Sequence, residues 1–200
     1  MKSGVKNVLC LTIITLVAGF ALGYVYDVTK EPIRIMEEKT KQEAYSKVFA
    51  GASEFTEESI DEGAVADKLH GTGFDHVDCD SVLSAKDASG NIAGYVINVT
   101  SHEGYGGDIS LSVGIANDGM VQGVEILSIS ETAGLGMKAT GEDFRNQFSG
   151  KAVSMFTYTK QEPTADFEIQ ALSGATITTN AVTNAVNGAL CVFEKIGGGL

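Results

Sequence analysis

A hydroxyl-rich segment near the C-terminus contains the residue types that can hold a phosphate group. Residues 172–180 read L-S-G-A-T-I-T-T-N and carry no charged side chain. Apolar residues recur at helical spacing from Val182 to Phe193, so we expect a helix whose N-cap is Thr178 or Thr179. Free backbone N–H groups and the positive end of the helix dipole favour an anion at such a place. The segment is therefore either a phosphate site or an ordinary Ser/Thr turn that caps a helix.

Two glycine-rich loops each place one large apolar side chain between glycines. Residues 101–109 read S-H-E-G-Y-G-G-D-I around Tyr105, and residues 131–138 read E-T-A-G-L-G-M-K around Leu135. Neither loop matches the dinucleotide-binding G-x-G-x-x-G pattern or the P-loop lysine pattern. By themselves, both loops are typical of turns.

The elements that must position these segments follow from the periodicity of the chain. Alternation of apolar and polar residues, with hairpin turns at 87–91 and 117–119, predicts antiparallel strands. The predicted strands are 77–85, 92–100, 109–116, 120–129 and 152–159. Helices are predicted at 29–50, 57–69 and 141–148, besides the helix after residue 180. Helices, then antiparallel strands, then a final helix predict an α+β fold.

An apolar run near the N-terminus predicts a single membrane-spanning helix. Val8–Tyr26 contains no Asp, Glu, Lys, Arg or His, and at ~1.5 Å per residue it covers about 28 Å, close to the ~30 Å hydrocarbon core of a bilayer. Lys2 and Lys6 precede the run, which predicts a cytoplasmic N-terminus and an extracytoplasmic remainder in a cell membrane. The alternative is a signal peptide cleaved after the small residues at 21–23.

Three parts are expected along the chain. Residues 1–27 form the transmembrane anchor, residues 28–70 a helical stalk, and residues 71–200 the main domain. The stalk helix is predicted to start at Thr29, with Pro32 in its first turn, and to end at Gly51.

Charge and cysteine usage exclude some function classes. Without Lys2, Lys6 and Asp27, the whole-chain totals leave 12 basic and 25 acidic residues, which argues against a nucleic-acid partner. The three cysteines form no C-x-x-C pair, and the ligand-like residues near His76 alternate across a strand, so no metal site is expected. A disulfide between Cys79 and Cys191 is compatible with an extracytoplasmic domain, but the sequence does not decide it.

The segment S-G-A-T-I-T is similar to the flavinylation motif of the FMN-binding domain family. In that family a flavin transferase joins the phosphate of FMN to the threonine that ends S-G-A-T. The resemblance implies that Thr176 is the acceptor and that Ser173, Gly174 and Ala175 shape its loop. The family motif usually has an aspartate six residues before the acceptor, where this chain has Gln170.

Both glycine loops resemble the same family. The segment E-T-A-G-L-G looks like the family's E-T-P-G-L-G loop, with Ala133 in place of proline, and G-Y-G-G-D-I matches its glycine-tyrosine-glycine segment. The resemblance implies that these loops pack around the isoalloxazine ring and ribityl chain. The cofactor-binding residues expected in addition to the S-G-A-T segment are Tyr105, Gly106, Glu131, Thr132, Gly134, Leu135, Gly136, Lys138 and Thr178.

Within this family, the N-terminal span and the T-K-E-P segment at 29–32 look most like the flavin-carrying G subunits of Rnf complexes. The resemblance implies a redox subunit of a membrane-bound, ion-translocating ferredoxin:NAD⁺ oxidoreductase, not catalytic alone, which relays electrons between redox centres through covalent FMN. The implied partners are the complex's other membrane and iron–sulfur subunits, together with the flavin transferase. The alternatives are a C subunit of a sodium-translocating NADH:quinone reductase, a stand-alone membrane-anchored flavoprotein for extracellular electron transfer, and a flavin-free binding module.

Overall fold

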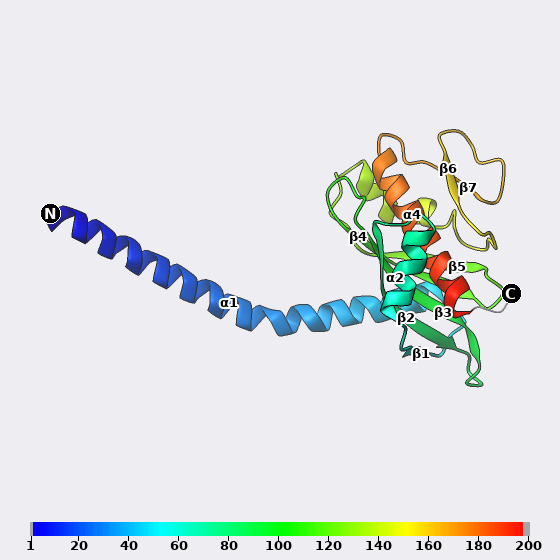
Figure 1. The fold of residues 1–200 in the computed structure, drawn as a ribbon, viewed down its shortest axis with the longest axis horizontal. Helices are drawn as coiled ribbons and strands as arrows, with labels where there is room; N and C mark the ends of the chain where they lie inside the picture. The colour runs from blue at the N-terminus through cyan, green and yellow to red at the C-terminus, as the bar shows by residue number, and fades with distance from the viewer. Residues whose placement is uncertain (1, 198–200) are drawn as a thin grey trace. The chain divides into compact units, whose positions relative to one another are not determined.

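The computed structural model describes residues 2–197 (Figure 1). The chain divides between Lys41 and Gln42 into two compact units, which are described separately. The first unit is helical from residue 2 onward, and the second contains a sheet with helices on it. The predicted α+β class is confirmed.

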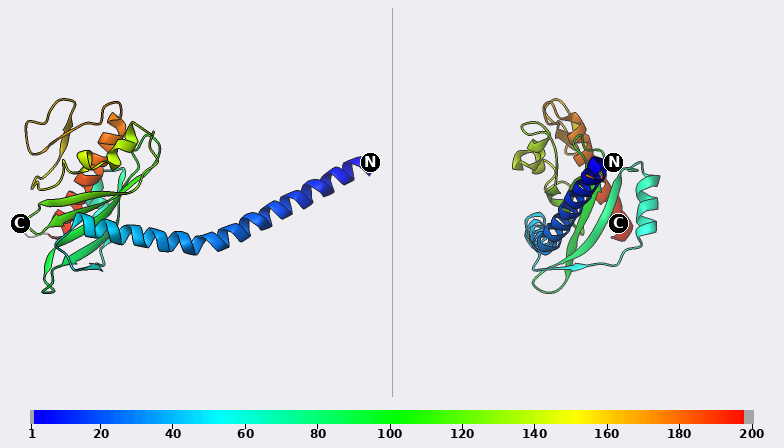
Figure 2. Two further views of the ribbon diagram at one scale, coloured as in Figure 1. Left: turned by 180° about the vertical axis from the view of Figure 1, so that it is seen from behind. Right: turned by 90° about the vertical axis from the view of Figure 1, so that its left-hand side faces the viewer.

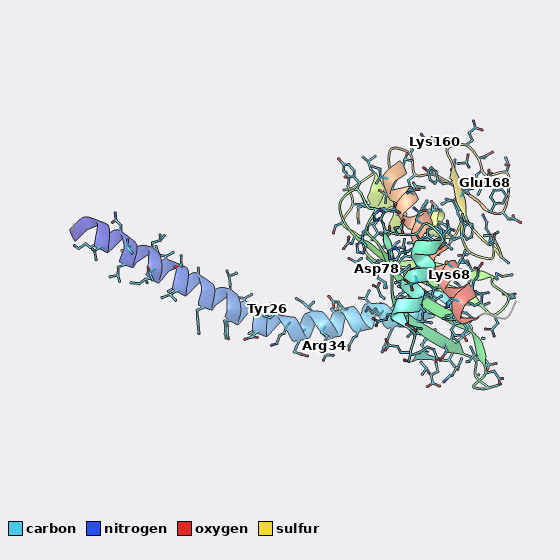
Figure 3. The ribbon with its side chains drawn as sticks, viewed as in Figure 1. Tyr26, Arg34, Lys68, Asp78, Lys160 and Glu168 are labelled. Carbon is cyan, nitrogen blue, oxygen red and sulfur yellow. The ribbon has the colours of Figure 1, made fainter. Side chains whose placement is uncertain are left out.

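Helix α1 (Lys2–Val48) runs without a break through the point where a separate stalk helix was predicted to start. That prediction is wrong, because α1 continues through Pro32, where the cost of the proline is offset by helix on both sides and by ion pairs across the turn. Ion pairs from Arg34 to Glu31 (3.0 Å) and to Glu38 (2.7 Å) join the turns around Pro32 (Figure 3). Of the described helices, α1 alone is long and apolar enough to cross a membrane.

Five antiparallel strands form the main sheet, in the order in which they occur in the chain. They are β1 (Glu54–Glu57), β2 (Val77–Lys86), β3 (Ile92–Ser101), β4 (Ile109–Ala116) and β5 (Val121–Ser128). The four long strands were predicted, and β1 was missed because four residues are too few to show alternation. Helix α2 (Glu62–Gly71) begins five residues later than predicted, where the Asp61 side chain accepts a hydrogen bond from the Ala64 N–H at 3.1 Å.

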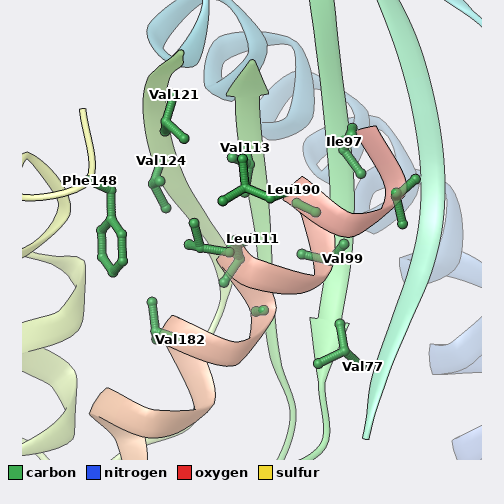
Figure 4. Packing of buried hydrophobic residues seen from close by; sticks show 14 of the residues in the cluster. Val77, Ile97, Val99, Leu111, Val113, Val121, Val124, Phe148, Val182 and Leu190 are labelled. Carbon is green, nitrogen blue, oxygen red and sulfur yellow. The ribbon is translucent and has the colours of Figure 1, made fainter. Parts of the chain in front are cut away.

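One face of the sheet is covered by α4 (Thr176–Ile196), with α2 beside it (Figures 1 and 2). Alternate residues of the strands point toward α4 and form the larger hydrophobic core. Figure 4 shows Val182 and Leu190 of α4 facing Leu111 and Val113 of β4. This packing fixes the axis of α4 on the sheet, and with it the position of the helix start.

The opposite face of the sheet is built around the last turn of α1. A Cβ atom on Gly114 would collide with the main chain of Val48, and one on Gly123 would lie 3.0 Å from the Val48 Cα. Strands β4 and β5 therefore need glycine where this turn crosses them. Beside the crossing, the buried Asn98 amide donates to the Tyr45 hydroxyl at 2.8 Å and accepts from the Ser112 hydroxyl.

Short elements connect β5 to α4. They are the 3₁₀-helix η1 (Gly136–Thr140), α3 (Glu142–Arg145), and a parallel pair of strands, β6 (Thr157–Thr159) and β7 (Glu168–Gln170). The predicted helix at 141–148 is limited to α3. The predicted strand at 152–159 is limited to β6, because both main-chain groups of Phe156 bond to the Asn187 side chain of α4, at 2.7 and 2.9 Å.

Candidate functional site

Helix α4 begins at Thr176, the predicted acceptor. Ala175 is the N-cap and supplies no side-chain hydrogen bond, and the first main-chain bond of the helix runs from the Thr179 N–H to the Ala175 carbonyl at 3.0 Å. The predicted caps, Thr178 and Thr179, are therefore wrong, because both lie inside the first turn. The Thr179 hydroxyl instead donates to the Ala175 carbonyl at 2.9 Å and accepts from the Leu172 N–H at 3.1 Å.

The start of α4 is suited to a negatively charged group. The N–H groups of Thr176, Ile177 and Thr178 come before the first main-chain bond of the helix, so they have no acceptor within it. The first turn contains no acidic side chain, which leaves the positive end of the helix dipole uncompensated by its own residues. A phosphate beside Thr176 would meet both the N–H groups and the dipole.

Two tight turns of the same form meet in front of this helix start. The Leu135 N–H donates to the Thr132 carbonyl at 3.1 Å, and the Ala175 N–H donates to the Leu172 carbonyl at 3.0 Å. The third residue of each turn is glycine with positive φ, +79° at Gly134 and +77° at Gly174. Such a turn favours glycine there, because other residues are strained at that φ.

The Leu135 side chain lies against the Thr176 loop. A Cβ atom on Gly174 would be 3.1 Å from the Leu135 Cδ2, so the two turns are in contact. Leu135 is nevertheless 42 % exposed and Ile177, in the first turn of α4, is 52 % exposed. Apolar side chains are thus available to a ligand beside the helix start.

Hydrogen bonds connect the Tyr105 loop, residues 102–108, to the Leu135 loop and to helix α4. The N–H groups of Tyr105 and Gly106 donate to the Glu131 Oε1 at 2.8 and 3.4 Å. On the other side, the Asn184 amide of α4 donates to the Glu103 Oε2 at 2.7 Å. The Tyr105 side chain itself is 71 % exposed.

The structure therefore brings the three predicted segments together, although they are far apart in the sequence. Ser173, Thr132 and Lys138 are exposed, whereas Gly136 and Thr178 are buried and in contact with each other. Glu103 and Asn184 were not predicted as part of the site. A lone carboxylate and a lone amide separated by 81 residues give no signal in a single sequence.

Gln170, which occupies the position of the family's aspartate, is the last residue of β7. Its main-chain N–H donates to the Gln147 Oε1 at 2.6 Å, and its side chain is exposed. Asp166 is also exposed. Both side chains are thus accessible to a modifying enzyme at the surface.

Cys79 and Cys191 are free thiols in the structure, so the disulfide that the sequence left open is not formed. Burial and the neighbouring Asp80 carboxylate raise the pKa of the Cys79 thiol to about 12, which makes it a poor nucleophile. Among the described residues, no group of three or more His, Cys, Asp or Glu side chains is arranged to hold a metal ion.

Comparison with known proteins places this arrangement in a family. Residues 104–191, which include the Leu135 and Thr176 segments and the Tyr105 loop from Gly104 onward, match the FMN-binding domain. The chain is 30 % identical over 190 residues to the G subunit of the Na⁺-translocating ferredoxin:NAD⁺ oxidoreductase complex of Acetobacterium woodii, covering 94 % of this chain and 90 % of that protein. It is 28 % identical to the G subunit of the ion-translocating oxidoreductase complex of Methanosarcina acetivorans, covering 94 % of each chain.

A solved structure has a similar fold. The C subunit of the Na⁺-translocating NADH-quinone reductase from Parabacteroides distasonis superposes with a TM-score of 0.58 over 84 % of this chain and 96 % of that one. At 15 % identity, this likeness concerns the fold alone.

The fold and the three segments thus define a protein with an FMN-binding domain that follows a long N-terminal helix. Because the similarity to the Acetobacterium protein extends over nearly the whole of both chains, this chain belongs to the family of G subunits of ion-translocating oxidoreductase complexes.

The residues present at the site fit FMN. Its phosphate matches the uncapped start of α4, where N–H groups without helical acceptors adjoin the Thr176 hydroxyl. A flat, largely apolar ring matches the exposed side chains of Tyr105, Leu135 and Ile177. The glycine at 174 has a φ of +77°, which lets the main chain turn directly into the helix start at Thr176.

Proposed function

We propose that this chain is the electron-carrying G subunit of a membrane-bound, ion-translocating ferredoxin:NAD⁺ oxidoreductase complex, with FMN joined by a phosphoester to Thr176. The observation that carries the proposal is the meeting of three distant segments at the uncapped start of α4, with Thr176 as its first residue. Membership of the family of G subunits supports the assignment to such a complex.

In this proposal the residues of the chain bind and orient the cofactor. The Thr176 hydroxyl oxygen forms the ester, and the N–H groups of the first helical turn stabilise the charge on the phosphate. Leu135 and Tyr105 cover faces of the ring, while Thr132 and Lys138 lie at the exposed edge of the site, where they can contact polar atoms of the flavin. The bound flavin supplies the redox chemistry, accepting electrons from one centre and passing them to another.

The N-terminal part of α1 anchors the protein. Val8–Tyr26 spans the membrane once, and Lys2 and Lys6 set the N-terminus in the cytoplasm, so the FMN-binding domain is extracytoplasmic. A covalent bond suits a carrier on that side, because a dissociated flavin would be lost from the cell. The span contains no ionisable side chain that could form an ion path, so ion translocation belongs to the partner membrane subunits.

The proposal is tested by the intact mass of the full chain. The protein is expressed with an active flavin transferase, as wild type and as Thr176→Ala, and is also examined for flavin fluorescence after denaturing electrophoresis. We expect the wild type to be heavier by one FMN less one water and to be fluorescent, and Thr176→Ala to have its unmodified mass. Thr157→Ala, which removes an exposed hydroxyl on β6 outside the site, is the matched control and should keep the flavin.

An unmodified wild-type chain would contradict the covalent attachment. In that case restoring the family's residue, as Gln170→Asp, separates two causes. A gain of flavin in this variant would show that Gln170 prevents recognition by the transferase, whereas no gain would favour a flavin-free binding module. The assignment to a complex is tested by purification from membranes, where partner proteins with several membrane spans should accompany the chain.

A further inference from the structure

The Glu131 carboxylate lies where the two glycine loops meet. Its Oε1 accepts from two consecutive main-chain N–H groups, those of Tyr105 at 2.8 Å and Gly106 at 3.4 Å. The side chain is half-buried, and hydrogen bonds to an ionised acceptor are stronger than neutral ones. One charged side chain therefore holds the tip of the Tyr105 loop.

Glycines from both loop motifs pack around this residue. A Cβ atom on Gly136 would lie 2.7 Å from the Glu131 Oε2, and one on Gly104 would lie 3.2 Å from its Oε1. A Cβ atom on Gly106 would collide with the Ser130 carbonyl and lie 3.4 Å from the Glu131 Cα. At Gly106 and Gly136 glycine makes room for the Ser130–Glu131 segment, whereas at Gly104 a Cβ atom would first collide with the Gly107 carbonyl, so the motifs have a structural reason independent of any ligand.

The same contacts reach the start of α4. A Cβ atom on Gly136 would be 2.6 Å from the Thr178 Oγ1, so Glu131 and Thr178 both border the space that a side chain at position 136 would fill. Thr178 is two residues after Thr176, on the first turn of the helix. Movement of Glu131 would therefore disturb the Tyr105 loop, the Leu135 turn and the helix start together.

We propose that Glu131 is a positioning residue that fixes the Tyr105 loop against the Leu135 turn and the start of α4, and that it acts on the flavin through these segments. The inference rests on the proposed function and deepens it. It adds to the expectation that Glu131 contacts the flavin, because two main-chain N–H groups of the Tyr105 loop bond to its Oε1.

The first test measures amide hydrogen exchange at Tyr105 and Gly106 in the full chain, in detergent micelles. The Thr176→Ala background removes the attached flavin, so the result does not depend on the cofactor. Glu131→Ala should raise exchange of both amides by about tenfold or more, because the acceptor is charged. Glu131→Gln, which keeps an acceptor oxygen, should raise it less, and Glu162→Gln, which changes an exposed carboxylate, should leave it unchanged.

Amides of β4 and β5 show in the same experiment whether the domain remains folded. If Glu131→Ala loses their protection, Glu131→Gln provides the test, since it removes the charge and keeps the length of the side chain. Unchanged exchange at Tyr105 and Gly106 in the folded variants would overturn the proposal.

The second test uses the flavin as the readout. In chains with Thr176 intact, the visible circular dichroism of the bound flavin should change in Glu131→Ala and stay the same in Glu162→Gln. A faster-exchanging loop with an unchanged flavin spectrum would overturn the positioning role. Absence of flavin from the wild type would contradict the proposed function instead, and the exchange experiment would still decide whether Glu131 holds the loop.

Discussion

The two faces of the main sheet are built from the same strands but by different means. On the face toward α4, apolar side chains such as Leu111, Val113 and Val186 interlock and are fully buried. On the face toward the end of α1, glycines let a helix turn approach the strand main chain, and a polar group, the Asn98 amide, is buried among hydroxyls. Neighbouring residues of one strand, such as Val113 and Gly114, thus serve opposite kinds of packing.

The two faces therefore contribute to the fold in different ways. Apolar packing against α4 is extensive, so it supplies most of the stability and fixes the helix that carries Thr176. The other face joins the domain to the last turn of α1 through a smaller hydrophobic cluster, close contact at glycines and directional hydrogen bonds. Such contacts depend on shape and tolerate few substitutions, because any added atom meets main chain.

The largest effect is expected from the α4 face. Leu111→Ala removes a fully buried side chain, and we expect the free energy of unfolding to fall by about 3 kcal/mol, from lost burial and the cavity that remains. Urea denaturation of the full chain in detergent micelles measures this change. Ile92→Ala is the matched control, because Ile92 is 42 % exposed, and it should cost less than about 1 kcal/mol. Equal losses in the two variants would contradict the inference that apolar burial against α4 supplies most of the stability.

The face toward the end of α1 should be destabilised by an added side-chain atom, whereas the face toward α4 is destabilised by a lost one. In Gly114→Ala the new methyl group meets the Val48 main chain, and we expect a loss of about 2 kcal/mol, accompanied by faster amide exchange at the end of α1. Gly51→Ala is the control, since a Cβ atom there has no neighbour within 4 Å. A Gly114→Ala protein as stable as the wild type would mean that this turn is held loosely.

The sequence predicted the face toward α4 well, because alternation reports which side chains are buried on one side of a strand. It placed β2 to β5 within two residues of their observed ends. It did not reveal why Gly114 and Gly123 occur inside strands, since their partner is a helix turn far away in the chain. It also split α1 at Thr29, because local signals for a helix start do not show whether the preceding turn continues.

The site was predicted in part, for a similar reason. Motif resemblance pointed to the Thr176, Tyr105 and Leu135 segments, and the structure brings all three together. The ties between them were not predicted, because hydrogen bonds such as Asn184 to Glu103 depend on how α4 crosses the sheet. The true start of α4 was missed because Ala175 has no capping side chain, which is the same property that leaves the helix start open to an anion.

The smallest effect is expected from His102, which follows the end of β3. His102 bonds to Asp78 (3.0 Å) and to Asp108 (2.9 Å), and these two hydrogen bonds raise the pKa of the imidazole. Because the folded-state pKa is raised, protonated His102 stabilises the fold fully below the unfolded pKa of about 6.5. That stability is lost as the pH rises through the higher folded-state pKa.

The His102 side chain is 42 % exposed, so we expect this contribution to be below about 1 kcal/mol. It should appear as a fall in stability as the pH rises above about 6.5, and this fall should be weaker in His102→Gln, whose side chain carries no charge at any of these pH values. His76→Gln is the matched control, because His76 is an exposed residue on the loop before β2. His102 is the first residue of the Tyr105 loop. Faster exchange of the Tyr105 amide in His102→Gln would therefore show that His102 also helps to hold this loop at the candidate site. An identical pH profile in His102→Gln and wild type would contradict a contribution of the His102 charge to the stability of the fold.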